Sequence, residues 1–100
     1  MTNSGKDVPP IEITSYDNQY ILKTRTEVVK EVHFINIEIV NRNTEKIVYT
    51  IENEYRAFDF QEVTWEEESN NFWVKSGDLG IFCYQYVGDE QWEKCESKGE

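Results

Sequence analysis

The sequence has no long hydrophobic run. No segment approaches the roughly 18 uninterrupted apolar residues of a membrane-spanning helix, so we expect no membrane insertion. The stretch from Met1 to Pro10 also lacks the apolar core of a secretion signal. If Met1 is the native start, a cytoplasmic protein is expected. The polar opening with Pro9-Pro10 is equally typical of the spacer after a removed signal or lipid anchor, which predicts an extracellular or surface-anchored protein.

Cysteine and histidine are scarce, with two cysteines and one histidine in 100 residues. Two thiols without a nearby histidine or a second cysteine pair do not form a zinc site. Cys83 lies inside an apolar segment, which favours a buried and unreactive thiol. The alternative is a disulfide between Cys83 and Cys95, which would require an oxidising compartment.

The motifs of catalysis are also missing. His33 is the only candidate for a histidine acid or base, and its place between Val32 and Phe34 indicates a structural residue of a strand. The chain has no G-x-S-x-G turn and no glycine-rich phosphate loop. The acidic run from Glu66 to Glu68 lacks the spacing of a calcium loop. We therefore predict no enzymatic activity, no cofactor and no metal site.

Basic residues are few, and the excess of acidic residues is unevenly distributed along the chain. The formal net charge is -10, with 20 acidic and 10 basic residues. Residues 1–50 hold six Lys/Arg and seven Asp/Glu, whereas residues 51–100 hold four and thirteen, so the second half carries -9. Such a field repels nucleic acids and anionic membranes and attracts a basic protein surface. The alternative is that the acidity only keeps the protein soluble.

What the sequence does contain is alternation of apolar and polar residues, which indicates β-strands. Strands are expected near residues 11–15, 20–28, 62–66, 72–75 and 79–87, with a β-hairpin over residues 32–52 and an irregular crossing over residues 52–60. No connection is long enough for a helical crossover, so the strands should pair antiparallel.

These strands predict an all-β fold. Six to seven short strands favour a small antiparallel β-sandwich, immunoglobulin-like by base rate, and a small β-barrel is the alternative. We expect a flexible segment over residues 1–10, one sandwich domain over residues 11–87 and a polar, partly disordered tail over residues 88–100, unless Trp92 docks back onto the domain. The oligomeric state is left open.

Aromatic residues coincide with the acidic half. Trp65, Trp73, Tyr84 and Tyr86 fall on three consecutive expected strands, and tyrosine and tryptophan beside acidic rims are typical of protein interfaces. The alternative is that all of them pack in the core. If they contribute to binding, the partner-binding residues are predicted to be Glu66, Glu67, Glu68, Trp73, Asp78 and Tyr86.

The segments 63–65 and 69–80 resemble a hairpin of small bacterial proteins without an assigned activity. In size, acidity and lack of catalytic residues, the chain resembles the immunity proteins of bacterial toxin systems. That resemblance implies an inhibitor that masks a basic protein partner. A second hypothesis is an extracellular or lipoprotein-derived module that binds carbohydrate through exposed aromatics, and a third is a structural role in a larger bacterial assembly.

Overall fold

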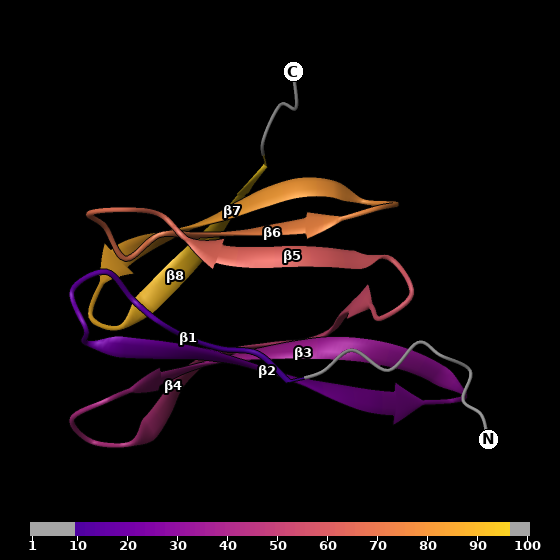
Figure 1. Cartoon of the computed structure of the whole chain (residues 1–100), viewed down its shortest axis with the longest axis horizontal. Helices are drawn as coiled ribbons and strands as arrows, with labels where there is room; N and C mark the ends of the chain where they lie inside the picture. The colour runs from indigo at the N-terminus through magenta and orange to yellow at the C-terminus, as the bar shows by residue number, and fades with distance from the viewer. Residues whose placement is uncertain (1–9, 97–100) are drawn as a thin grey trace.

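Two four-stranded antiparallel sheets form the protein (Figure 1). The computed structural model describes residues 10–96, so the expectations for residues 1–9 and 97–100 lie outside the described part of the chain. The first sheet holds β1 (Glu12–Thr14), β2 (Tyr20–Val29), β3 (Val32–Asn41) and β4 (Lys46–Arg56). The second sheet holds β5 (Phe60–Trp65), β6 (Phe72–Ser76), β7 (Gly80–Gly88) and β8 (Gln91–Glu96). The predicted all-β sandwich is confirmed.

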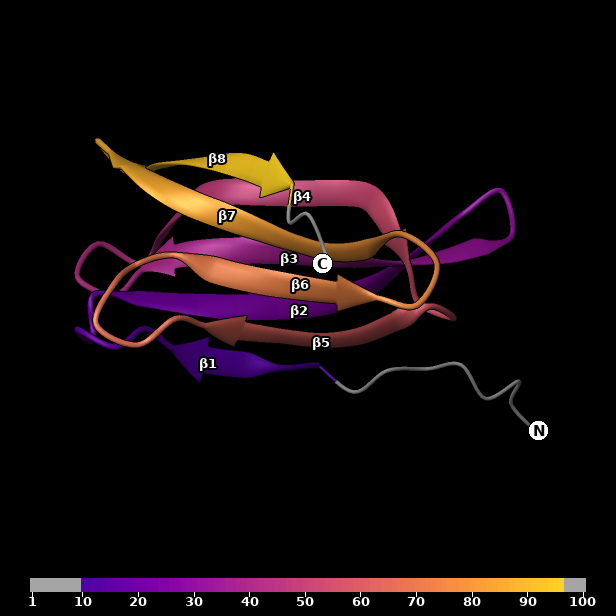
Figure 2. The ribbon, with the colours of Figure 1, turned by 90° about the horizontal axis from the view of Figure 1, so that it is seen from above.

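The topology is simpler than the immunoglobulin arrangement. Immunoglobulin sheets exchange strands through Greek-key connections, but here each sheet is a meander of four consecutive strands. The chain changes layers once, between β4 and β5, and Figure 2 shows the strands of the two layers running in similar directions. Among the described residues no ladder joins the two sheets, so the barrel alternative is not realised.

The core lies between the sheets and follows from alternation. Tyr20 and Leu22 of β2 point inward, and Leu22 lies opposite Ile39 of β3 in the antiparallel register. Val74 of β6 and Tyr84 of β7 close the core from the second sheet. Burial of each such side chain stabilises the fold by about 1.5–3 kcal/mol, so this inward stripe holds the layers together.

The region expected to be an irregular crossing is mostly strand. β4 continues to Arg56, and only residues 57–59 separate it from β5. A bulge centred on Asn53 (φ 58°) interrupts the alternation, and the Asn53 backbone N–H donates to the buried Asn36 side chain at 3.0 Å. The bulge adds two residues to β4, so Tyr55 keeps the parity of Ile51 and is fully buried on the inner face. The irregular sequence pattern is therefore the signature of a bulge.

The tail expected over residues 88–100 is wrong for residues 91–96, which form β8 and give the sandwich its eighth strand. Trp92 docks into the core with only 4% of its surface exposed. A disulfide joins Cys83 to its cross-strand neighbour Cys95, so the free, buried thiol expected for Cys83 is also wrong. Both differences have one cause, because pairing of β8 with β7 places the two cysteines side by side.

Candidate functional site

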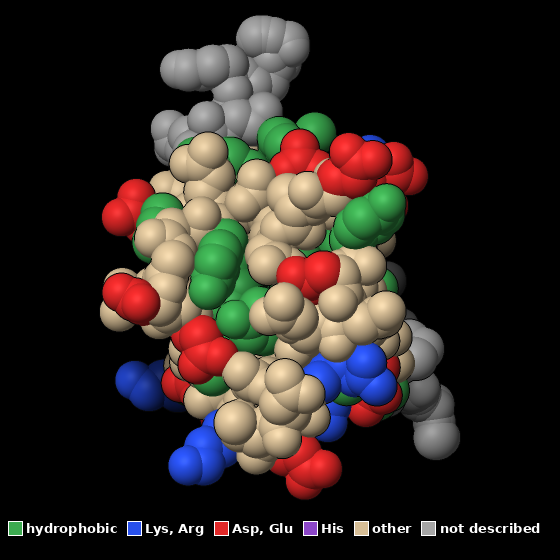
Figure 3. Space-filling view, turned by 90° about the vertical axis from the view of Figure 1, so that its left-hand side faces the viewer, with side chains coloured by type: hydrophobic (Ala, Val, Ile, Leu, Met, Phe, Trp, Pro, Cys, Tyr) green, Lys and Arg blue, Asp and Glu red, His purple; other side chains and the backbone are tan. Residues whose placement is uncertain are grey.

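The turns between strands gather at the two ends of the sandwich. Antiparallel neighbours reverse direction at every connection, so the first, third, fifth and seventh connections meet at one end. We call this end, made of residues 15–19, 42–45, 66–71 and 89–90, the acidic end. Its carboxylates outnumber its single cation, Arg42, by seven to one, and they are Asp17, Glu45, Glu66, Glu67, Glu68, Asp89 and Glu90. Figure 3 faces this end and shows acidic side chains around an exposed apolar centre.

The opposite end is much less charged. Its connections are residues 30–31, 57–59 and 77–79, and they carry three carboxylates and one lysine. The formal charge of the turns is therefore -6 at the acidic end and -2 at the other. The charge of the turns is thus unequal at the two ends of the strands. At the acidic end, the acidic residues of the second half of the sequence lie together with Asp17 and Glu45 of the first half.

Glu90 binds the two sheets together at the acidic end. Its carboxylate accepts hydrogen bonds from the Tyr20 hydroxyl at 3.5 Å and from the Asn41 side chain of the first sheet. Its backbone N–H donates to the Tyr86 hydroxyl at 3.2 Å. Burial, followed by the contact with Tyr86, raises the pKa of Tyr20 well above its ordinary value, so this hydroxyl stays neutral and remains a donor.

Asp17 makes a second connection between the sheets. It accepts hydrogen bonds from Ser15 at 2.9 Å, from the Gln19 backbone at 3.0 Å and from the Asn70 side chain at 3.2 Å. Slight burial raises the pKa of this carboxyl, but the hydrogen bonds outweigh it and hold the pKa below the ordinary value. Asp17 therefore stays ionised and fixes the β1–β2 turn against the β5–β6 loop.

Aromatic rings form a platform beneath these turns. The ring of Trp92 lies 5.3 Å from that of Tyr20 and 4.9 Å from that of Tyr86. The indole N–H of Trp92 donates to the Asn70 carbonyl at 2.7 Å and so supports the β5–β6 loop from below. Within that loop the Glu66 carboxylate accepts from Asn71 at 2.8 Å. The acidic end is consequently a preformed surface.

Four carboxylates of this end have no structural task among the described residues. The side chains of Glu45, Glu67, Glu68 and Asp89 are exposed and form no hydrogen bond or ion pair within residues 10–96. Three of them, Glu45, Glu68 and Asp89, sit at positive φ in their turns, at 62°, 64° and 56°. These four groups are the ones available to another molecule.

The structure brings together four of the six predicted binding residues. Glu66, Glu67 and Glu68 lie in the β5–β6 loop at the acidic end, and Tyr86 is half-buried in the aromatic platform below it. Glu66 has a structural role through Asn71, so only its two neighbours are free.

Trp73 and Asp78 lie elsewhere. Trp73 points to the outer face of the second sheet, because it alternates with the buried Phe72. Asp78 lies in the β6–β7 turn at the opposite end, one strand length away from the acidic loop. It accepts from Ser76 at 2.8 Å and pairs with Arg56 at 2.8 Å, which together hold its pKa below the ordinary value despite slight desolvation. Its contacts are internal and join that turn to β4.

The sequence-based prediction missed Glu45 and Asp89. Both follow from counting connections, because the odd-numbered turns of a meander share one end. That count requires β8, and without it Asp89 appears to belong to a tail. Glu45 escaped because it lies in the less acidic half of the chain.

Among the described residues no group of three or more His, Cys, Asp or Glu side chains is placed to hold a metal ion. His33 is exposed at the start of β3. No helix in residues 10–96 is long and apolar enough to cross a membrane. No protein-family model, curated protein or solved structure matches the chain.

Proposed function

We propose that this chain is a non-catalytic binding protein that docks its acidic end on a basic surface of a protein partner. The observation that carries the proposal is the concentration of seven carboxylates and a single arginine in four turns at one end of the sandwich. Charge complementarity of this kind accelerates encounter and selects against acidic partners.

The construction of the surface supports this function. Asp17 and Glu90 tie the two sheets together, and Trp92 supports the loop that carries Glu67 and Glu68. A surface that is already ordered loses little conformational entropy on binding. The free carboxylates are thus displayed on a preformed frame, in the way that favours rapid and specific association.

Masking of a basic partner is the form of this function that the resemblance to immunity proteins implies. In that form the partner is a toxin whose basic surface is covered by the acidic end. Co-expression of the chain with the product of an adjacent gene, followed by measurement of complex formation, identifies such a partner directly.

The experiment that tests the role of the acidic end is a matched pair of charge reversals. Glu67→Lys/Glu68→Lys changes two exposed carboxylates of the acidic end, and Glu31→Lys/Glu62→Lys makes the same change of charge elsewhere. Glu31 (φ 69°) matches Glu68 (φ 64°) in backbone conformation. We expect the first variant to lose the partner in a binding titration and the second to retain it. Retention by both variants, or equal loss by both, contradicts the proposal.

A second candidate function, an extracellular module that binds carbohydrate, is favoured by a different observation. The Cys83–Cys95 disulfide is typical of an oxidising compartment, which favours an extracellular module. On the same outer sheet face the half-buried Trp73 lies between Thr64 and Cys83 in one cross-strand row, and the solvent-facing part of its indole is suited to stack on a sugar ring. Titration of wild type and Trp73→Ala with soluble oligosaccharides tests this function. Saturable binding that Trp73→Ala abolishes and Tyr16→Ala retains would support it, and absence of binding to wild type would reject it.

A further inference from the structure

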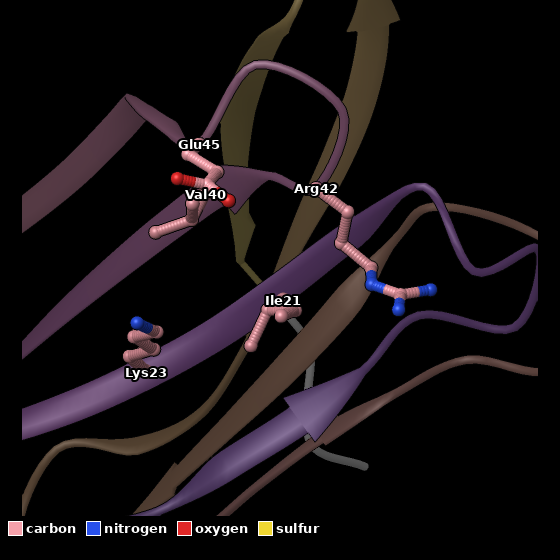
Figure 4. Close-up of a pocket in the computed structure, with 5 residues that line it drawn as sticks. All are labelled: Ile21, Lys23, Val40, Arg42 and Glu45. Carbon is pink, nitrogen blue, oxygen red and sulfur yellow. The ribbon is translucent and has the colours of Figure 1, made fainter.

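A hollow lies on the outer face of the first sheet. Of the four free carboxylates of the acidic end, only Glu45 lies at its rim. The hollow has a volume of about 440 Å³ and is lined by Ile21, Lys23, Val40, Arg42 and Glu45 (Figure 4). Ile21 and Val40 are cross-strand partners on β2 and β3 and form an apolar floor. The charged side chains of the other three residues stand around it.

Arg42 differs from the other arginines of the described chain. Arg25 contacts three carboxylates, and Arg56 contacts two. Arg42 pairs with no carboxylate within residues 10–96, and its guanidinium donates only to the Asn18 carbonyl, at 3.1 Å. The chain has twice as many acidic as basic residues, yet this arginine has no carboxylate partner within the described range. A guanidinium has five N–H donors, so Arg42 has donors left to bind an anion.

The rest of the rim selects the kind of anion. Lys23, on the other side of Ile21 in Figure 4, adds a second cation and forms one long ion pair with Glu12, at 3.6 Å. Glu45 brings a negative charge that disfavours a dianion such as a phosphate monoester. The five lining residues together carry one net positive charge over an apolar floor. Because Lys23 is shared with Glu12, Arg42 is the cation left to complement a single negative charge on an apolar body.

We propose that this hollow binds a small amphipathic carboxylate, with its head group on Arg42 and its apolar part on Ile21 and Val40. Arginine is suited to the head because its planar fork matches a carboxylate in a bidentate manner. The volume lies at the lower end of the range for small-molecule sites, roughly 300–1,000 Å³, which limits the ligand to a short chain or a single residue. Two sources share this chemistry: a free aliphatic acid and the apolar C-terminal residue of a peptide.

Nuclear magnetic resonance titration of the full chain tests the site. Octanoate represents the free acid and N-acetyl-leucine the peptide terminus. We expect saturable shifts at Ile21, Val40 and Arg42 with at least one of them, and no saturation with acetate or octylamine at the same concentrations. Tighter binding of octanoate assigns a free acid, and tighter binding of N-acetyl-leucine assigns a peptide terminus.

The variants Arg42→Gln and Lys46→Gln make the same change of charge in the β3–β4 hairpin, but Lys46 does not line the hollow. We expect Arg42→Gln to weaken binding about tenfold or more, because one charge-assisted contact is lost, and Lys46→Gln to change it less than about twofold. Unchanged amide shifts outside the hairpin show that both variants are folded. Equal affinity of the two variants, octylamine binding as well as octanoate, or no binding of either acid overturns the proposal.

Discussion

Two tyrosine hydroxyls meet inside the sandwich, where both side chains are shielded from solvent. Tyr55 of β4 and Tyr84 of β7 are 0% and 1% exposed, and their oxygens lie 2.5 Å apart. Burial raises the pKa of Tyr55 to about 12, and burial together with the bond to Tyr55 raises that of Tyr84 further. The pair therefore joins the two sheets through a neutral hydrogen bond in the middle of the core.

This pair predicts alkaline instability. Tyrosines in the unfolded chain release their protons near pH 10, whereas the folded pair keeps its protons to higher pH. Because both folded pKa values are raised, the stabilisation is complete below about pH 10 and falls as the pH rises through about 12. Urea unfolding from neutral to alkaline pH measures the loss.

The double variant Tyr55→Phe/Tyr84→Phe isolates this effect. It removes both hydroxyls together, so neither is left unpaired in the core. We expect a flatter pH dependence than in wild type, whereas Tyr16→Phe, at a tyrosine that is 59% exposed, keeps the wild-type profile. Identical alkaline profiles for the double variant and wild type would show that other groups cause the instability.

At the scale of elements, β8 carries more of the fold than its composition suggests. Trp92 contacts rings from both sheets, including Tyr49 of β4 at 5.5 Å and Tyr20 of β2. Lys94 follows on the same face, lies 4.3 Å from the Phe82 ring and pairs with Glu54 of β4. β8 thus closes the open edge of the sandwich beside β4.

Trp92→Ala tests this role of β8. Replacement of a buried tryptophan by alanine costs about 3–5 kcal/mol, which is a large part of a typical total stability of about 5–15 kcal/mol. Urea unfolding gives the difference, and Trp73→Ala on the outer sheet face is the comparison, with a smaller expected loss. If the two variants are equally stable, residues 91–96 contribute no more to the core than the outer face does.

The disulfide should reinforce the same strand. Cys83 and Cys95 are separated by 12 positions in the sequence, and their Cα atoms are 5.1 Å apart. Closing a loop of this size restricts the unfolded chain and is worth about 2–3 kcal/mol. We expect Cys83→Ala/Cys95→Ala to lose about this amount in urea unfolding.

Reductant provides the control for this prediction. It should lower the stability of wild type toward that of the double variant and leave the variant unchanged. Insensitivity of wild type to complete reduction, verified by thiol titration, would contradict a stabilising role for the bond.

Sequence pattern predicted the elements whose alternation is unbroken. The isoleucines of β3 occupy every second position from Ile35 to Ile39, so that strand and its hairpin were found. The end of β4 was missed because the bulge places the polar, exposed Asn53 where unbroken alternation would put a buried apolar residue. β8 was missed because Trp92 is followed on the same face by the exposed Lys94, whose ion-pair partner Glu54 is distant in sequence.

Prediction of the candidate site succeeded and failed in the same way as prediction of the strands. The acidity of residues 66–68 is visible in the sequence, and those residues do lie at the acidic end. Which other carboxylates join them depends on how many strands precede each turn. Trp73 was assigned to the binding set because it is an aromatic on an expected strand next to that of Tyr86, although its strand parity places it on the opposite face of the sheet. Local pattern thus locates charged segments, and topology decides which of them meet.

At the scale of the whole molecule, the acidic end should destabilise the fold. Seven carboxylates in adjacent turns repel one another, and four of them, Glu45, Glu67, Glu68 and Asp89, gain no partner among the described residues in return. The two control carboxylates have cations close by, since Glu31 follows Lys30 in the β2–β3 turn and Glu62 of β5 lies opposite Lys75 of β6. Groups that cost stability without a structural role are typical of functional surfaces.

The difference between these two groups of carboxylates gives a prediction. It distinguishes a role of the acidic end in binding from a role of net charge in solubility. Glu67→Lys/Glu68→Lys should raise the urea midpoint at low ionic strength, and the gain should shrink near 1 M salt, where the screening length falls to about 3 Å. Glu31→Lys/Glu62→Lys should give a smaller gain, because those reversals place like charges beside Lys30 and Lys75. If both pairs stabilise the protein equally, net charge alone governs the effect, and the acidic end is not specialised. If only the first pair stabilises while weakening partner binding, the same carboxylates oppose folding and support recognition.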